Sequence, residues 1–137
     1  MKKSLLFLAL FSSVAFADVG ALNSDVTQDN INTTICKSGW TKIVRPKVSY
    51  TNKIKKKQLS SIGASAADMK LYIEDHIVPL EVGGHPSSED NLAPQLKTDS
   101  KAKDRAENLV HKRICKGQIT LAEGQKVFQQ QLWKDYK

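Results

Sequence analysis

The stretch EDHIVPL, residues 74–80, joins an acid and a histidine to an apolar run, and the rest of the chain is interpreted around it. A Gly-Gly pair follows at residues 83–84, and Asn91 lies fifteen positions after His76. In a β-strand, neighbouring side chains point to opposite faces. Asp75 and His76 can therefore perform two tasks at one place, with one side chain holding a metal ion and the other meeting the substrate.

The first seventeen residues form a segment of their own in a chain whose length of 137 residues favours one domain. They combine a basic start at residues 2–3, an apolar run over residues 5–11 and a small-residue cleavage site over residues 15–17. This order is typical of a secretory signal peptide, and the apolar run is too short to span a bilayer. We expect an exported protein, periplasmic or secreted, with no membrane partner once residues 1–17 are removed.

The chain is basic, with a formal net charge of +7 that falls to +5 when Lys2 and Lys3 leave with the signal peptide. A basic exported domain suggests an acidic partner such as nucleic acid or an anionic cell surface. Its densest positive patch lies within residues 53–57, where four of the five residues are lysines. Such a run is commonly a solvated helix face, and it contacts phosphates if an active site lies beside it. The sequence leaves both interpretations open.

Cys36 and Cys115 are the only cysteines. In an oxidising compartment the pair predicts a disulfide, which would close a loop of about 80 residues and stabilise the fold by roughly 4 kcal/mol in the chain-entropy model. The alternative is a metal-ligand role, but two cysteines this far apart lack the paired spacing of a zinc site. We therefore expect the disulfide.

The pattern elsewhere predicts a small α+β domain over residues 35–137, preceded by a flexible leader over residues 18–34 that shows no periodicity. Residues 40–44 are expected to form a short strand that ends at Arg45-Pro46. A helix is expected over residues 53–62, with Thr51 or Asn52 as its N-cap.

A central strand is expected to open at residue 71 and to carry Asp75 and His76 near its end. Val82 is expected to seed a second short strand, so that the two form a hairpin. Apolar residues at helical spacing predict a helix from about residue 98 to Lys116-Gly117. The spacing of Thr120 and Glu123 predicts a capping box and a last helix. The apolar face of that helix is expected to contain Val127, Phe128, Leu132 and Trp133.

The order of these features resembles the HNH endonucleases, the ββα-metal or His-Me finger group. The matching positions are residues 75–80, Gly83-Gly84, Asn91-Leu92 and Lys103-Asp104. The flanks, residues 35–52 and 103–117, are also similar to those of a subset of small exported or phage-associated HNH proteins. The resemblance implies an α+β fold with one ββα-metal motif and flanking helices. It also implies a secreted endonuclease that hydrolyses phosphodiester bonds of DNA without sequence specificity, and it leaves RNA open as a second substrate.

The resemblance assigns a role to each residue of the central stretch. His76 is the expected general base, because histidine titrates near the operating pH. Asp75 is expected to bind a divalent cation that stabilises the charge developing on the scissile phosphate. A hard carboxylate ligand suits Mg²⁺ or Mn²⁺ better than Zn²⁺. Asn91 matches the middle residue of the signature, whose amide braces the loop around the histidine.

The third position of the signature departs from the family pattern. The family's His or Asn ligand lies nine residues after the middle Asn, where this chain has Ser100, a poor sole ligand. Asp104, one helical turn later on the same face, is the first candidate for that ligand, and Asp99 is the second. Either acid could instead be one that the helix dipole stabilises. The departure keeps a second function open, a catalytically impaired HNH scaffold that binds nucleic acid or envelope polyanions.

The sequence also predicts roles for the remaining lysine, histidine and tryptophan side chains. Backbone phosphates of DNA are expected to meet Lys55, Lys56, Lys57, Lys97, Lys101 and Lys103, without base readout. His85 is expected to be an exposed, incidental loop residue, and His111 to have a structural role beside Cys115. Trp40 and Trp133 are expected to pack against the core. We expect a monomer.

Overall fold

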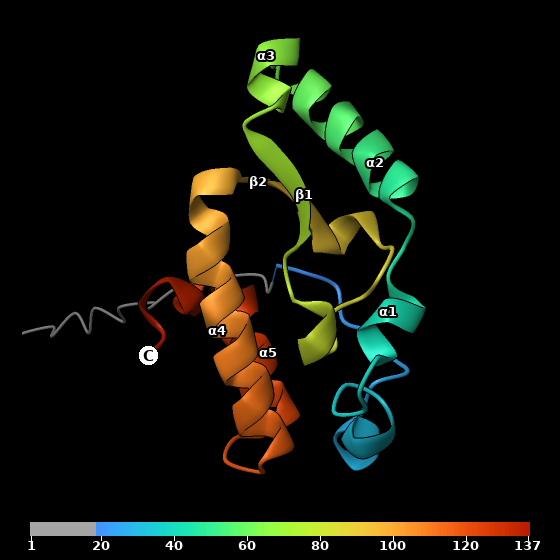
Figure 1. Ribbon diagram of the computed structural model, residues 1–137, viewed down its shortest axis with the longest axis vertical. Helices are drawn as coiled ribbons and strands as arrows, with labels where there is room; N and C mark the ends of the chain where they lie inside the picture. The colour runs from blue at the N-terminus through green and yellow to red at the C-terminus, as the bar shows by residue number, and fades with distance from the viewer. Residues whose placement is uncertain (1–18) are drawn as a thin grey trace, which may run out of the picture.

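The computed structural model describes residues 19–137, so the predicted signal peptide, residues 1–17, lies outside the described part (Figure 1). Its elements are η1 (Gln28–Thr33), α1 (Trp40–Val44), α2 (Val48–Ser61), α3 (Ala66–Met69), β1 (Tyr72–His76), η2 (Leu80–Val82), η3 (Glu89–Asn91), β2 (Leu92–Leu96), α4 (Lys97–Cys115), α5 (Leu121–Gln129) and η4 (Leu132–Asp135). Helices, a two-stranded sheet and a Cys36–Cys115 disulfide confirm the α+β class and the predicted cysteine pairing. Within residues 19–137, no helix is both long and apolar enough to cross a membrane.

The sheet consists of β1 and β2 in antiparallel register, from Tyr72 opposite Leu96 to His76 opposite Leu92. The central strand is therefore where the sequence predicts it, but its partner is not the strand expected at Val82. Val82 ends the 3-10 turn η2, and its amide donates to the carbonyl of Pro79 at 3.0 Å. An isolated apolar residue between a proline turn and two glycines lacks the length for a ladder, so the predicted hairpin at Val82 is wrong.

The segment expected to be a short strand over residues 40–44 is the helix α1. Gly39, in the left-handed region at φ 81°, begins this helix, and Arg45 leaves it in extended conformation before Pro46. Trp40 packs against the core, whereas Ile43 is 79 % exposed. The segment closes its backbone hydrogen bonds locally, as a helix, and not in a ladder with another strand.

Helix α2 begins at Val48 after the N-cap Lys47, five residues earlier than predicted, so Thr51 and Asn52 lie inside it. Its inner face buries Ile54 and Leu59, and Gln58 donates through Nε2 to the carbonyl of Leu92 at 2.9 Å. This bond holds α2 on the outer edge of β2. Figure 1 shows β1 lying between α2 and α4.

The two C-terminal helices begin and end close to their predicted positions. Helix α4 is followed by Gly117 at φ 69°, the left-handed conformation that glycine supplies at helix ends. At the start of α5, the Thr120 hydroxyl accepts from the amide of Glu123 at 3.2 Å, and the Glu123 carboxylate accepts from the amide of Thr120 at 2.7 Å. The predicted capping box is therefore confirmed. Leu132 and Trp133 do not belong to α5, which ends at Gln129; they lie in η4.

The core forms where α4 and α5 pack together and against η2, and Figure 1 shows α5 behind α4. Its buried members are Val26, Ile31, Ile35, Val78, Val82, Ala106, Val110, Ile114, Leu121, Val127 and Phe128. Val26 and Ile31 come from the segment expected to be a flexible leader. The amide of Asn23 donates to the carbonyl of Gly83 at 2.9 Å, and Leu22 forms a β-bridge with Gly84. This segment is thus packed as part of the domain and covers the loop after β1.

Candidate active site

His76 ends β1 with only 6 % of its surface exposed. Its Nε2 lies 2.8 Å from the carbonyl oxygen of Pro86, so Nε2 carries the hydrogen and donates it. This tautomer leaves the lone pair on Nδ1. Burial lowers the pKa of His76 below its ordinary value of 6.5, so the ring is neutral near pH 7. The residue has the protonation state and orientation of a general base that acts through Nδ1.

Asn91 is fully buried and ties together the loop that holds His76. Its Oδ1 accepts from the amide of Val78 at 2.8 Å, while Nδ2 donates to the carbonyls of Val78 at 3.0 Å and of His85 at 2.9 Å. The turn at Gly84 has room only for hydrogen, since a Cβ there would lie 1.8 Å from the Val78 oxygen. These bonds fix residues 78–86, and with them the Pro86 carbonyl that orients the histidine.

Asp75 points toward α4, where it meets a buried lysine. Lys103 is 4 % exposed, and its ammonium donates to Oδ2 of Asp75 and to the carbonyl oxygen of His76. The same ammonium lies 3.4 Å from Oε1 of Glu107, one helical turn further along α4. Lys103 thus lies inside the site as the partner of two carboxylates, whereas the sequence placed it among surface contacts to phosphate.

Two glutamates lie beside this pair, and the sequence did not place them in the site; it suggested only that Glu107 could pair with neighbours on its helix. Burial raises the pKa of Glu107 to about 7, against the opposing effect of Lys103. Burial also raises the pKa of Glu74 to about 7, although Lys55 opposes the shift, and both of its carboxylate oxygens are buried without a hydrogen-bond partner. The positions of both glutamates in the sequence do indicate that they lie near the site. Glu74 shares a strand face with His76, and Glu107 lies four residues after Lys103 on the same helix face.

Asp75 and His76 line three hollows that surround them. The largest, an open cleft of about 370 Å³, extends along β1 and β2 to Asp99 and to the C-terminal turn. A small polar cavity of about 130 Å³ lies on the other side, toward Glu107. The third, of about 260 Å³, opens toward α2 and includes Glu74. The Asp-His pair therefore borders an open cleft.

The candidates for the third ligand lie in different places. Ser100 donates its hydroxyl to the carbonyl of Lys97 at 2.8 Å, an internal bond of the first turn of α4. Asp99 lines the large cleft together with Asp75 and His76. Asp104 is exposed and lines none of the three hollows described above. The fold thus brings Asp99, the second candidate from the sequence, to the same cleft as Asp75.

The predicted phosphate contacts divide into two kinds. The ammonium of Lys55 donates to the carbonyl of Tyr72 at 3.2 Å, and that of Lys57 forms an ion pair with Glu89 at 2.8 Å. The exposed lysines of the predicted set are Lys56, Lys57, Lys97 and Lys101, and within residues 19–137 only Lys57 among these four forms an ion pair. Lys97 and Lys101 lie on the first turns of α4. Each is two residues from Asp99, which lines the cleft.

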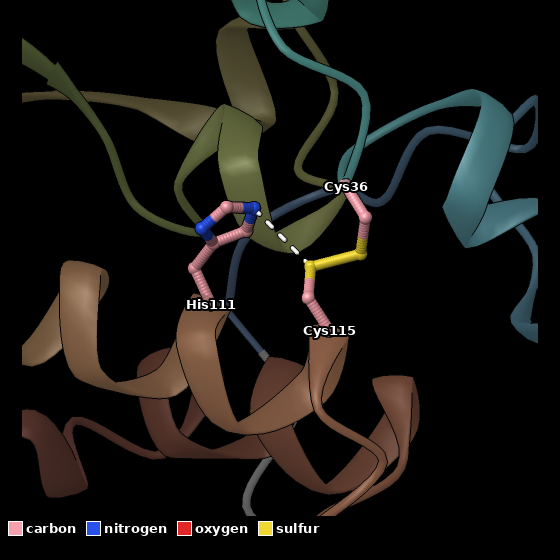
Figure 2. A group of neighbouring side chains, drawn as sticks. All are labelled: Cys36, His111 and Cys115. Atoms are coloured by element: carbon pink, nitrogen blue, oxygen red, sulfur yellow. Dashed lines mark hydrogen bonds between the residues drawn. A yellow bond between two sulfur atoms is a disulfide. The ribbon is translucent and has the colours of Figure 1, made fainter.

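His111 packs against the disulfide, as Figure 2 shows. Its Nε2 lies 2.9 Å from the carbonyl of Ile35 and 3.4 Å from Sγ of Cys115, and Nδ1 lies 3.9 Å from the Glu81 carboxylate. The ligand atoms of Cys36, His111 and Cys115 lie within 4.8 Å of one another, close enough to share a metal ion. With the two sulfurs joined to each other, however, no thiolate is available, and the group acts as a covalent clamp.

His85 differs from the incidental loop residue that we expected. Its Nδ1 accepts from the amides of Ser87 at 3.2 Å and Ser88 at 2.9 Å, and the side chain is partly buried. It therefore shapes the turn that presents the Pro86 carbonyl. This role could not be predicted from the sequence, because a histidine that accepts hydrogen bonds from nearby backbone amides has no distinctive spacing.

No model of a known protein family, no curated protein and no solved structure matches the chain.

Proposed function

We propose that the chain is an exported, metal-dependent endonuclease of the HNH type that hydrolyses phosphodiester bonds of DNA without sequence specificity. The observation that carries the proposal is the His76 ring, held through Nε2 by the Pro86 carbonyl beside the carboxylate of Asp75. The order of β1, a long loop, β2 and α4 agrees with the ββα arrangement that the resemblance implies. The positive net charge of the chain suits a polyanionic substrate.

The proposed chemistry assigns proton transfer to His76. Its Nδ1 accepts a proton from the attacking water, and the bond from Nε2 to Pro86 keeps the ring from rotating as this happens. The adjacent loop is rigid because Asn91 bonds it at three points. Asn91 is thus a positioning residue that acts through the histidine.

We assign a hard divalent cation such as Mg²⁺ or Mn²⁺ to the carboxylates that line the cleft with His76. Lys103 contacts Oδ2 of Asp75, which leaves Oδ1 as a donor, and Asp99 offers a second carboxylate in the same cleft. Asp104 is the ligand that the resemblance suggests first, and it lies on the exposed side of α4. When bound, the ion would neutralise charge on the scissile phosphate.

Cleavage of supercoiled plasmid with Mg²⁺ or Mn²⁺ tests the proposal. His76→Ala should lower the rate by roughly 10²–10⁴-fold, the range for loss of a general base. The variant should keep its thermal unfolding midpoint to within a few degrees, so that lost activity is not lost fold. Equal cleavage by both proteins at matched purity, or cleavage by neither, contradicts the proposal.

A second function, a non-catalytic scaffold that binds nucleic acid or envelope polyanions, is favoured by one observation. The ammonium of Lys103 already neutralises part of the Asp75 charge, and Ser100 turns its hydroxyl back onto α4. A protein of this kind would retard DNA in a gel with and without metal and would never cleave it.

A further inference from the structure

The large cleft next to Asp75 and His76 extends to the C-terminal turn. Its walls there are largely apolar and come from Tyr72, Pro94, Phe128, Gln131, Trp133 and Lys134. Three aromatic rings and a lysine therefore share one hollow with the two residues to which we assign the chemistry. The general-base mechanism uses none of these four side chains.

A strained residue creates this end of the cleft. Gln131 has φ 55°, and it is the one non-glycine residue with positive φ within residues 19–137. Such a conformation costs about 1 kcal/mol or more and tends to persist at functional sites. It turns the chain after α5 so that η4 returns toward α4, and Trp133 and Gln131 itself then line the hollow.

The residues after η4 are held in place by contacts with Arg113 of α4. Nη1 of Arg113 donates to the Tyr136 hydroxyl at 2.9 Å, and its guanidinium lies 5.0 Å from the centre of the Tyr136 ring. Nη2 of the same arginine donates to the carbonyl of Lys137 at 3.0 Å. Trp133 is partly buried against the core. The indole is therefore held in place before any ligand arrives.

The combination of an aromatic ring and a positive charge suits an unpaired nucleotide. Lys134 places its ammonium 5.8 Å from the centre of the Trp133 ring. Proteins bind single strands by stacking bases on aromatic side chains while basic residues follow the phosphates. A volume of about 370 Å³ lies near the lower end of the range for small-molecule sites, roughly 300–1,000 Å³. The hollow can take one nucleotide and is too small to enclose a duplex.

We propose that this end of the cleft is a subsite for one unpaired base of a single-stranded nucleic acid, with Trp133 as the stacking surface. The base would lie against Trp133 while its phosphate reaches toward Asp75 and His76. The amide of Gln131 is available to the edge of the base. This inference rests on the proposed function for its choice of ligand, and it predicts preference for single strands or frayed ends over intact duplex.

Tryptophan fluorescence tests the subsite without any cleavage. Trp40→Phe leaves Trp133 as the only tryptophan, because the chain has two. The probe is oligothymidylate of about eight nucleotides, added in EDTA so that no metal-dependent step occurs. Stacking should quench the emission of Trp133. A fully abasic chain of equal length and charge should bind through its phosphates and leave the emission unchanged.

Matched variants then measure the contribution to affinity. Trp133→Ala should weaken oligothymidylate binding by about tenfold or more, and Trp133→Phe, which keeps an aromatic face, should lose less. Leu132→Ala changes an exposed neighbour on the same turn that does not line the cleft, and should have no effect. Equal quenching by the abasic chain, equal affinity for duplex, or unchanged affinity in Trp133→Ala would each overturn the subsite.

The outcomes separate the subsite from the nuclease itself. Quenching by oligothymidylate without cleavage under any metal would support the subsite and contradict the enzyme. Plasmid cleavage that depends on His76, with no quenching of Trp133, would support the enzyme and contradict the subsite.

Discussion

Replacing Asn91 with alanine should destabilise the protein more than any exposed asparagine could, because two buried groups of Val78 and a partly buried carbonyl lose their partner at once. The side chain is fully buried, and its bonds go to the amide of Val78, the carbonyl of Val78 and the carbonyl of His85. Val78 is itself fully buried, so water cannot easily replace the lost bonds. The change therefore leaves polar groups without partners in the core.

The magnitude follows from those groups. A buried donor or acceptor left unsatisfied costs about 1–3 kcal/mol. Some relaxation of the loop is expected, so the total for Asn91→Ala should be about 3–5 kcal/mol. This is a large share of the roughly 5–15 kcal/mol that stabilises a typical domain. The protein should still fold, but with a clearly lower free energy of unfolding.

Urea unfolding followed by circular dichroism measures the effect, with Asn108→Ala as the matched control. Asn108 is an exposed asparagine on α4, and its change should alter stability by no more than about 0.5 kcal/mol. If Asn91→Ala loses less than about 1 kcal/mol relative to this control, the loop is not held by the amide. Activity should fall further than the loss of folded protein explains, because the Pro86 carbonyl would no longer fix His76.

Three further predictions follow from the site and the clamp. Glu74 keeps a proton in the folded state between its ordinary pKa of 4.5 and about 7, so wild-type stability should fall as pH rises through that window. Unfolding in EDTA should show Glu74→Gln to be more stable than wild type by about 1–2 kcal/mol at pH 8, a value reduced for solvent screening, and similar to it at pH 5. The double change Cys36→Ser with Cys115→Ser should cost about 4–5 kcal/mol in urea unfolding, since the bridged residues are 79 positions apart, and a loss below 1 kcal/mol would contradict the clamp. Calorimetry with Mn²⁺ should show at least about tenfold weaker binding for Asp99→Asn and unchanged binding for Asp104→Asn, while the reverse order would restore Asp104 as the ligand.

The features that the sequence predicted correctly depend on local or periodic signals. Each of these signals spans only a few residues. They are the Asp-His strand end, the capping box of α5 and the glycine after α4. The disulfide followed from the number of cysteines and from the expectation of an oxidising compartment. These signals do not require knowledge of what lies next to them in space.

The errors arose where tertiary contacts decide. Residues 40–44 have strand-like composition, but only a neighbouring edge could have made them a strand. Residues 19–34 looked like a leader because Val26 and Ile31 are too sparse to form a pattern, although both reach the core. The second strand begins directly after Asn91 and was not predicted, and it contains Pro94, a residue that cannot donate to a ladder. A proline is tolerated there because the sheet has only two strands, so both are edges.

Lys103 shows why the site itself could be read only in part. A lysine in a polar helix is normally solvated, and the position of Lys103 in the sequence gives no indication that its side chain is buried. Here three oxygen atoms compensate the ammonium, from Asp75, His76 and Glu107. Because Asp75 shares its charge with this lysine, a divalent ion would find a weaker site than two free carboxylates provide. Mg²⁺ is usually held by one or two carboxylates together with substrate phosphates. In the proposed enzyme the phosphate therefore helps to hold the ion, so that the metal is bound more tightly when nucleic acid lies in the cleft.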